Sequence, residues 1–162
     1  MGLDISAYQK LTKCAKDYGD DYDAGYEAGA MYLTIIDSFA NAADGYSGWY
    51  ETSGEKSFGF RAGSYGGYNT WRAWLAQLVG NTAENIWEKH EPGPFVELIN
   101  FSDCEGTIGP KTSAKLAKDF AEWHDRAVLF GKKIGEDWFI DKYNQWAIAF
   151  NLAANDGVVT FH

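Results

Sequence analysis

The sequence is poor in the residue types that build disulfide or metal frameworks. Its 162 residues include only two cysteines, Cys14 and Cys104, and three histidines. Two thiols are too few for a disulfide framework or a cysteine-only zinc site, and no HExxH, HxH or CxxC spacing occurs. We therefore predict reduced thiols, no structural or catalytic metal, and no cofactor.

Long hydrophobic runs are also missing. No apolar stretch approaches the roughly 18 residues that cross a bilayer, and the first residues lack a basic segment followed by an apolar one. The sequence therefore predicts a soluble, cytoplasmic protein with no membrane partner. Only three prolines occur and 17% of the residues are aromatic, which is typical of a packed globular domain and not of disorder.

Basic side chains are scarce, which bears on the partners. Lys and Arg number 14 against 23 Asp and Glu, giving a formal net charge of −9, and residues 1–60 hold most of the imbalance. Because binding to nucleic acid backbones needs clustered basic residues, we predict no nucleic acid polymer as a partner.

The segment 17–29, DYGDDYDAGYEAG, gathers acids and tyrosines. A calcium loop starting at Asp21 would place Gly25 where an oxygen ligand belongs and Tyr32 where a bidentate Glu is required. We therefore predict a solvated acidic loop and not a calcium site.

The strand signals are short and scattered. Residues 1–6 alternate apolar and polar side chains, and VVTFH at 158–162 predicts a final strand. Strands around Trp49 and Phe58 are predicted to pair as a hairpin, closed by a turn at Ser53-Gly54.

The helix signals are clearest in the last third of the chain. Helices are predicted over 70–79, 82–89, 110–130 and 136–153, the last two with apolar residues at steps of three and four. Residues 7–15 and 31–43 fit either a helix or a strand, although residue type favours a strand through Ile36. We predict one domain, 1–162, of α+β class. In it, a small antiparallel sheet packs against three or four helices, including a C-terminal antiparallel helix pair.

The stretch from Phe58 to Leu78, FGFRAGSYGGYNTWRAWLAQL, combines four glycines with aromatic residues and two of the three arginines. Its glycines predict a turn, with Asn69 as the N-cap of the following helix. Free backbone N–H groups at a helix N-terminus and Arg side chains both suit an anion, and the aromatic rings suit a base or sugar. An Arg in a first helical turn is expected to be exposed, so losing Arg72 should weaken binding and leave folding intact.

A second polar cluster follows the apolar segment at 95–101 and could line a cleft. The predicted ligand-binding residues of both stretches are Arg61, Ser64, Tyr65, Gly66, Gly67, Tyr68, Trp71, Arg72, Ser102 and Asp103. The alternative is that the first stretch is only core, because Trp71, Leu75 and Leu78 have the spacing of a buried helix face.

Another hypothesis for the second cluster is a thiol nucleophile. Cys104 with His124 as its base would resemble a recurrent catalytic pair. However, the flanking carboxylates of Asp103 and Glu105 would repel a thiolate, and free cysteines are usually small buried hydrophobes.

Nearly the whole chain resembles an uncharacterised family of small bacteriophage and prophage proteins. The resemblance lies in GLDISAY, FGFRAGSYGGYNTWR, FVELINFSDCEGTIGP, KLAKDF and the ending VVTFH. It implies a phage setting, in which small proteins without catalytic motifs often act against host immunity, and it implies no reaction.

Together these points predict a non-enzymatic binder of a small nucleotide-like anionic signalling molecule, which would counter host immunity. One alternative is a hydrolase of such a nucleotide, with Asp103 or Glu105 as general base. The other is an acidic inhibitor that binds a host defence protein through residues 17–27. Homo-oligomers are compatible with each of them.

Overall fold

The computed structural model describes residues 1–52 and 56–162, so the predicted turn at Ser53-Gly54 lies outside the described residues. The elements in chain order are β1 (Gly2–Tyr8), β2 (Thr12–Lys13), α1 (Tyr22–Glu27), β3 (Ala30–Leu33), the 3-10 helix η1 (Asp37–Ala43), β4 (Gly48–Glu51), β5 (Ser57–Ser64), α2 (Tyr65–Leu78), α3 (Ala83–Lys89), α4 (Val96–Ile99), β6 (Gly106–Ile108), α5 (Pro110–Glu122), α6 (His124–Ile134), α7 (Asp137–Ala153) and β7 (Val158–Phe161). The α+β class is confirmed.

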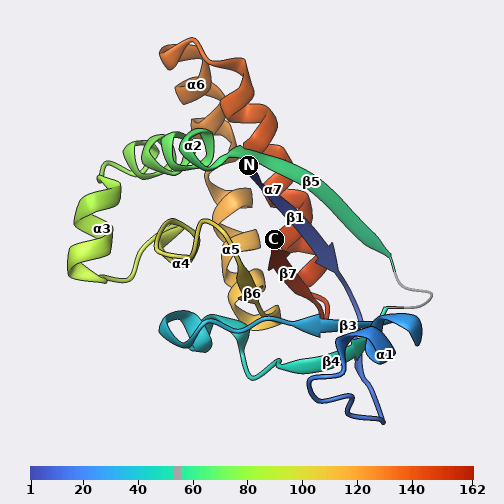
Figure 1. Cartoon of the computed structure of the whole chain (residues 1–162). Helices are drawn as coiled ribbons and strands as arrows, with labels where there is room; N and C mark the ends of the chain where they lie inside the picture. The colour runs from blue at the N-terminus through green and yellow to red at the C-terminus, as the bar shows by residue number, and fades with distance from the viewer. Residues whose placement is uncertain (53–55) are drawn as a thin grey trace.

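The strands form two antiparallel sheets, where one was predicted (Figure 1). The larger sheet has the order β5-β1-β7-β6, and the smaller has the order β2-β4-β3. The predicted hairpin between the Trp49 and Phe58 strands is wrong, because β4 pairs with β2 and β3 while β5 pairs with β1. Local strand signals identified both strands, but pairing depends on partners far away in the sequence.

Helices α2, α5 and α7 pack on one face of the four-stranded sheet. Alternation along β1 turns Leu3, Ile5 and Ala7 toward these helices, and each is at most 1% exposed. Among the largest buried side chains are Trp71 and Trp146, whose rings stack with centroids 5.9 Å apart. The many aromatic side chains of the protein therefore serve mainly to fill this core.

Residues 7–15 and 31–43, which fitted either a helix or a strand, contain only short elements. Strand β1 runs through Tyr8, and residues 31–43 divide between β3 and the 3-10 helix η1, so the strand ends at Leu33 and not at Ile36. The predicted helix over 110–130 is broken at Trp123 into α5 and α6. Its apolar steps continue across Trp123, so the spacing gives no sign of the break. Within residues 1–52 and 56–162, none of the helices has both the length and the apolarity that a bilayer crossing requires.

Candidate functional site

Helix α2 begins earlier than predicted. Ser64 is its N-cap, with the side-chain oxygen accepting a bond from the Gly67 N–H at 3.0 Å, so the prediction of Asn69 as N-cap is wrong. Gly66 and Gly67 are helical residues and not turn residues. The glycine density suggested a turn, but a serine cap and the packing of the helix on the sheet outweigh the low helix propensity of glycine.

Arg72 is a buried structural residue, only 4% exposed, and the expectation that it is exposed is wrong. Its Nη1 donates to the backbone oxygens of Ile99 at 3.0 Å and Phe101 at 2.6 Å, and its Nη2 donates to the Asn69 side chain. The guanidinium also lies 4.7 Å from the centroid of the Tyr68 ring. These donors bind the chain itself, which leaves Arg72 little capacity for a phosphate.

Tyr68 and Trp71 are also fully enclosed, at 0% exposure. The Trp71 indole donates to the Phe139 carbonyl at 3.1 Å, and burial raises the pKa of the Tyr68 hydroxyl well above its usual range. Neither ring presents a face on which a ligand could stack in this structure. The core alternative therefore describes these two residues and Arg72.

The stretch from Phe58 to Leu78 and the second polar cluster, which follows residues 95–101, contact each other. The Asn69 amide donates to the Asp103 carboxylate at 2.9 Å, and the Arg72 guanidinium lies 3.9 Å from the same carboxylate. Ser102 organises the loop, since its hydroxyl accepts from the backbone N–H groups of Cys104 and Glu105, each at 3.3 Å. The cluster therefore ties α2 to the loop before β6.

Cys104 is exposed, and its sulfur lies 3.5 Å from the Ser102 hydroxyl. No hydrogen bond or ion pair in the described part of the chain connects Cys104 to His124, whose ring lies beside Tyr143 and Asp125. The thiol–imidazole pair therefore gains no geometric support.

Arg61 belongs to a different surface, the polar face of the four-stranded sheet. Strand register places it opposite Asp4, and their side chains form an exposed ion pair at 3.4 Å. Asp4 in turn exchanges both backbone hydrogen bonds with His162, at 2.8 and 3.0 Å. Because directly opposed residues point to the same face of an antiparallel sheet, Arg61, Asp4 and His162 form one row across three strands.

The next positions continue this polar face. The Ser6 hydroxyl lies 2.9 Å from His162 Nε2, and the Thr160 hydroxyl donates to the Ser6 carbonyl at 3.3 Å. Thr107 on β6 stands opposite Thr160 and donates to the Thr34 carbonyl at 2.9 Å, which ties the sheet to the segment after β3.

A cavity of about 250 Å³ opens between this polar face and the α1–β3 segment. It is lined by Tyr8, Tyr26, Met31, Tyr32, Thr34, Gly106, Thr107, Thr160, Phe161 and His162. Its wall therefore combines three tyrosine rings with hydroxyl groups and one imidazole, a mixture that offers flat apolar faces and hydrogen-bonding groups together.

Trp49 supports the tyrosines of this wall. Its ring is 2% exposed and lies 5.4 Å from the Tyr26 ring and 5.2 Å from the Tyr32 ring. Helix α1 approaches it closely at Gly25, where an added Cβ would come within 2.3 Å of the indole. Tyr26 and Tyr32 are therefore held in position by packing against Trp49.

This cavity was not predicted from the sequence. The predicted site grouped Arg61 with Arg72 and did not include His162. The alternation in GLDISAY and VVTFH contained the missing signal, since it places Asp4 and Ser6 on one face of β1 and Thr160 and His162 on one face of β7. The pairing of those strands with each other was not visible in the sequence.

Searches of protein-family models, curated proteins and solved structures find no match to this chain. Four of the sequence segments quoted above come together in space. GLDISAY forms β1, VVTFH contains β7, FVELINFSDCEGTIGP contains β6, and FGFRAGSYGGYNTWR includes all of β5 except Ser57. These four strands make up the sheet that carries the polar face.

Proposed function

We propose that this protein binds a small nucleotide-like ligand in the cavity between its two sheets and does not transform it. The observation that carries the proposal is the wall of the cavity, where Tyr8, Tyr26 and Tyr32 share one space with the His162 imidazole and threonine hydroxyls. Tyrosine rings can stack on a base, and the hydroxyl and imidazole groups can bond a sugar or phosphate.

The row across the sheet supports an anionic group at one end of this ligand. Arg61 stands two strands away from His162, which corresponds to roughly 10 Å across an antiparallel sheet. That span suits a nucleotide whose base occupies the cavity and whose phosphate reaches Arg61. In a chain of net charge −9, binding of an anion requires a local cation, and Arg61 would exchange its exposed partner Asp4 for the phosphate.

The phage resemblance extends the proposal to a biological role. A phage protein that holds a signalling nucleotide without consuming it would counter host immunity by sequestration. The corrected site replaces Tyr68, Trp71 and Arg72 with the tyrosines of the cavity and retains Arg61.

Differential scanning fluorimetry and calorimetry test the proposal with cyclic dinucleotides, cyclic trinucleotides and ADP-ribose. At least one should stabilise the protein, and Arg61→Ala should weaken its binding by about 10- to 100-fold, the loss expected for one charged hydrogen bond. Tyr32→Ala should also weaken binding.

Arg126→Ala is the matched control, because Arg126 is an exposed arginine on α6 that stacks on Trp123 outside the cavity. Equal loss in Arg61→Ala and Arg126→Ala, or no stabilisation by any of these compounds, would overturn the proposal. Ligand recovered intact after heat denaturation supports sequestration, whereas recovery of a product would favour the hydrolase alternative.

A second candidate, an acidic inhibitor of a host defence protein, is favoured by the exposure of α1 and its flanks. Asp20, Asp23 and Glu27 are exposed and form no ion pair among the described residues, and Tyr22 and Tyr26 beside them are 41% and 57% exposed. Such a surface suits a basic partner protein.

This candidate predicts that a basic host protein co-purifies at low salt and is released at high salt. Neutralising Asp20, Asp23 and Glu27 to their amides should abolish the association. Neutralising three exposed acids on and after α3, Glu84, Glu88 and Glu91, changes the net charge equally and should have no effect. Loss with both triple variants would mean a general charge effect and would contradict a specific surface.

A further inference from the structure

The outer edge of β5 is unpaired in the described part of the chain, since β5 is the last strand of its sheet (Figure 1). The backbone bonds of Asp4 go to β7, so those of its neighbours Ile5 and Ala7 go to β5, where they meet Phe60 and Phe58. The alternate β5 residues therefore direct their N–H and C=O groups outward: Ser57, Gly59 and Arg61.

One of these outward groups already has a partner. The Lys142 ammonium of α7 donates to the Arg61 carbonyl at 2.6 Å, which agrees with the direction deduced from the register. This contact closes the Arg61 end of the edge. At the other end, the outward backbone groups of Ser57 and Gly59 bond to no other described residue, so they offer the donors and acceptors that an added strand would use.

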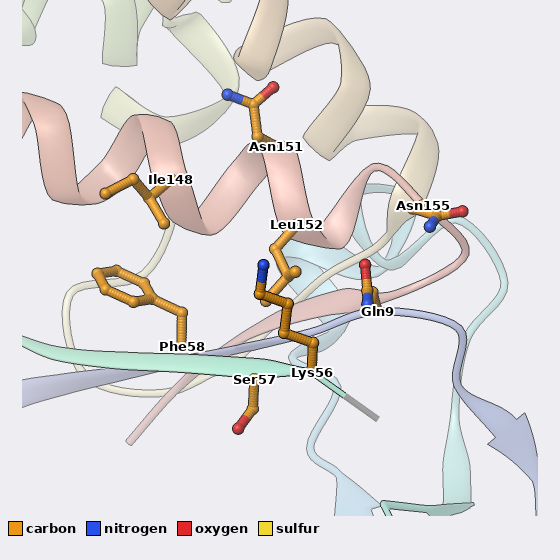
Figure 2. Close-up of a pocket in the computed structure, with 8 residues that line it drawn as sticks. All are labelled: Gln9, Lys56, Ser57, Phe58, Ile148, Asn151, Leu152 and Asn155. Atoms are coloured by element: carbon orange, nitrogen blue, oxygen red, sulfur yellow. The ribbon is translucent and has the colours of Figure 1, made fainter. Parts of the chain in front are cut away.

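A groove of about 420 Å³ lies beside that open end, between β5 and α7 (Figure 2). It is lined by Gln9, Lys56, Ser57, Phe58, Ile148, Asn151, Leu152 and Asn155. Figure 2 shows the Phe58 ring facing Ile148 and the Leu152 side chain directed toward β5, while the Gln9 and Asn155 amides lie at the far end. Ile148 is 49% exposed, so an apolar surface is left uncovered at this position.

Three basic side chains lie along this edge, one of which, Arg61, is paired with Asp4 of β1. Lys56 precedes β5, Arg61 lies within it, and Lys142 reaches it from α7. Positive side chains beside an open strand discourage pairing with a second basic edge and attract an acidic segment. The edge contrasts with the net charge of −9 of the whole chain.

We propose that this edge binds an extended, acidic peptide segment of a partner protein by strand addition. The peptide backbone bonds to Ser57 and Gly59, one of its apolar side chains enters the groove against Phe58, Ile148 and Leu152, and its acids face Lys56 and Lys142. In strand addition, main-chain bonds give affinity and a pocket for one side chain gives specificity. This surface is separate from the cavity, and the proposal does not rest on ligand binding there.

Fluorescence anisotropy tests the proposal with a defined probe, a labelled seven-residue peptide that alternates valine and glutamate and has leucine at its centre. Saturable binding is expected, and Ile148→Glu should weaken it at least about tenfold, because a carboxylate would replace the apolar wall and repel the acidic peptide. Lys56→Glu should weaken it in the same direction.

Leu129→Glu is the matched control, since Leu129 is an exposed leucine, 66% accessible, on α6. Two further readouts address the binding mode. The Gly59 amide should become protected from hydrogen exchange. The peptide can be N-methylated on either of its two alternating sets of amides, and only methylation of the set that faces β5 should abolish binding. Absence of saturable binding, equal binding of a peptide with lysine in place of glutamate, or an unprotected Gly59 amide would overturn the proposal.

Discussion

Replacing Arg72 by alanine is expected to destabilise the fold by roughly 3–5 kcal/mol. The guanidinium donates to the carbonyls of Ile99 and Phe101 and to the Asn69 side chain, and it is only 4% exposed. Charged hydrogen bonds of this kind contribute about 1.5–3 kcal/mol each, and deletion also leaves a buried acceptor unpaired. The Ile99 carbonyl would keep a bond from the Trp87 indole at 2.9 Å, so the Phe101 carbonyl bears most of the loss.

For a domain of this size, that change corresponds to a fall in melting temperature on the order of 10 °C. Thermal and urea denaturation followed by circular dichroism would measure it. Arg61→Ala is the control, since the exposed pair with Asp4 should change the free energy of unfolding by less than about 1 kcal/mol. If the two variants were equally stable, the structural role assigned to Arg72 would be wrong.

Replacing Gly157 by alanine is the second substitution that is expected to destabilise the fold. Gly157 lies between α7 and β7, where an added Cβ would stand 1.8 Å from the Tyr8 carbonyl oxygen and 2.7 Å from the Gln9 Cα. Both are backbone atoms and cannot move aside as a flexible side chain can. The end of β1 or the start of β7 would have to shift, and overpacking of this kind typically costs about 1–3 kcal/mol and occasionally more.

Gly66→Ala provides the opposite comparison within the same chain. Gly66 is in the first turn of α2 and has no atom within 4 Å of its ideal Cβ position. Alanine there should stabilise the protein by about 0.5–1 kcal/mol, the usual difference between the two residues in a helix. Urea denaturation of both variants would compare them. Destabilisation by Gly66→Ala, or a neutral Gly157→Ala, would contradict the backbone geometry at these positions.

Several elements could be predicted because their signals are local. Alternating side chains identified β1 and β7, Thr82 capped α3 as expected with its hydroxyl 3.1 Å from the Asn85 N–H, and apolar steps identified α7. Each of these depends on residues within a few positions of one another, so a single sequence is sufficient to reveal them.

The candidate site was predicted only in part, for reasons visible at α2. The glycines and aromatic residues around Arg72 are compatible both with a binding loop and with a helix packed on a sheet, so their composition does not distinguish the two. Their role depended on Ser64 capping the helix and on the backbone carbonyls of Ile99 and Phe101, 27 and 29 residues away, accepting the guanidinium. Arg61 remained a candidate because its side chain lies on the solvent-exposed face of β5, while the other face of the strand packs against the core.

The sequence by itself determined the class of the fold, the acidic character of the chain and most of the helices, since these follow from composition and short-range periodicity. Only the tertiary structure decided that the strands divide into two sheets, that Arg72 is a core residue, and that Tyr8, Tyr26, Tyr32 and His162 line one cavity. The physical reason is that strand pairing and burial are set by contacts between distant segments, which local propensity does not encode.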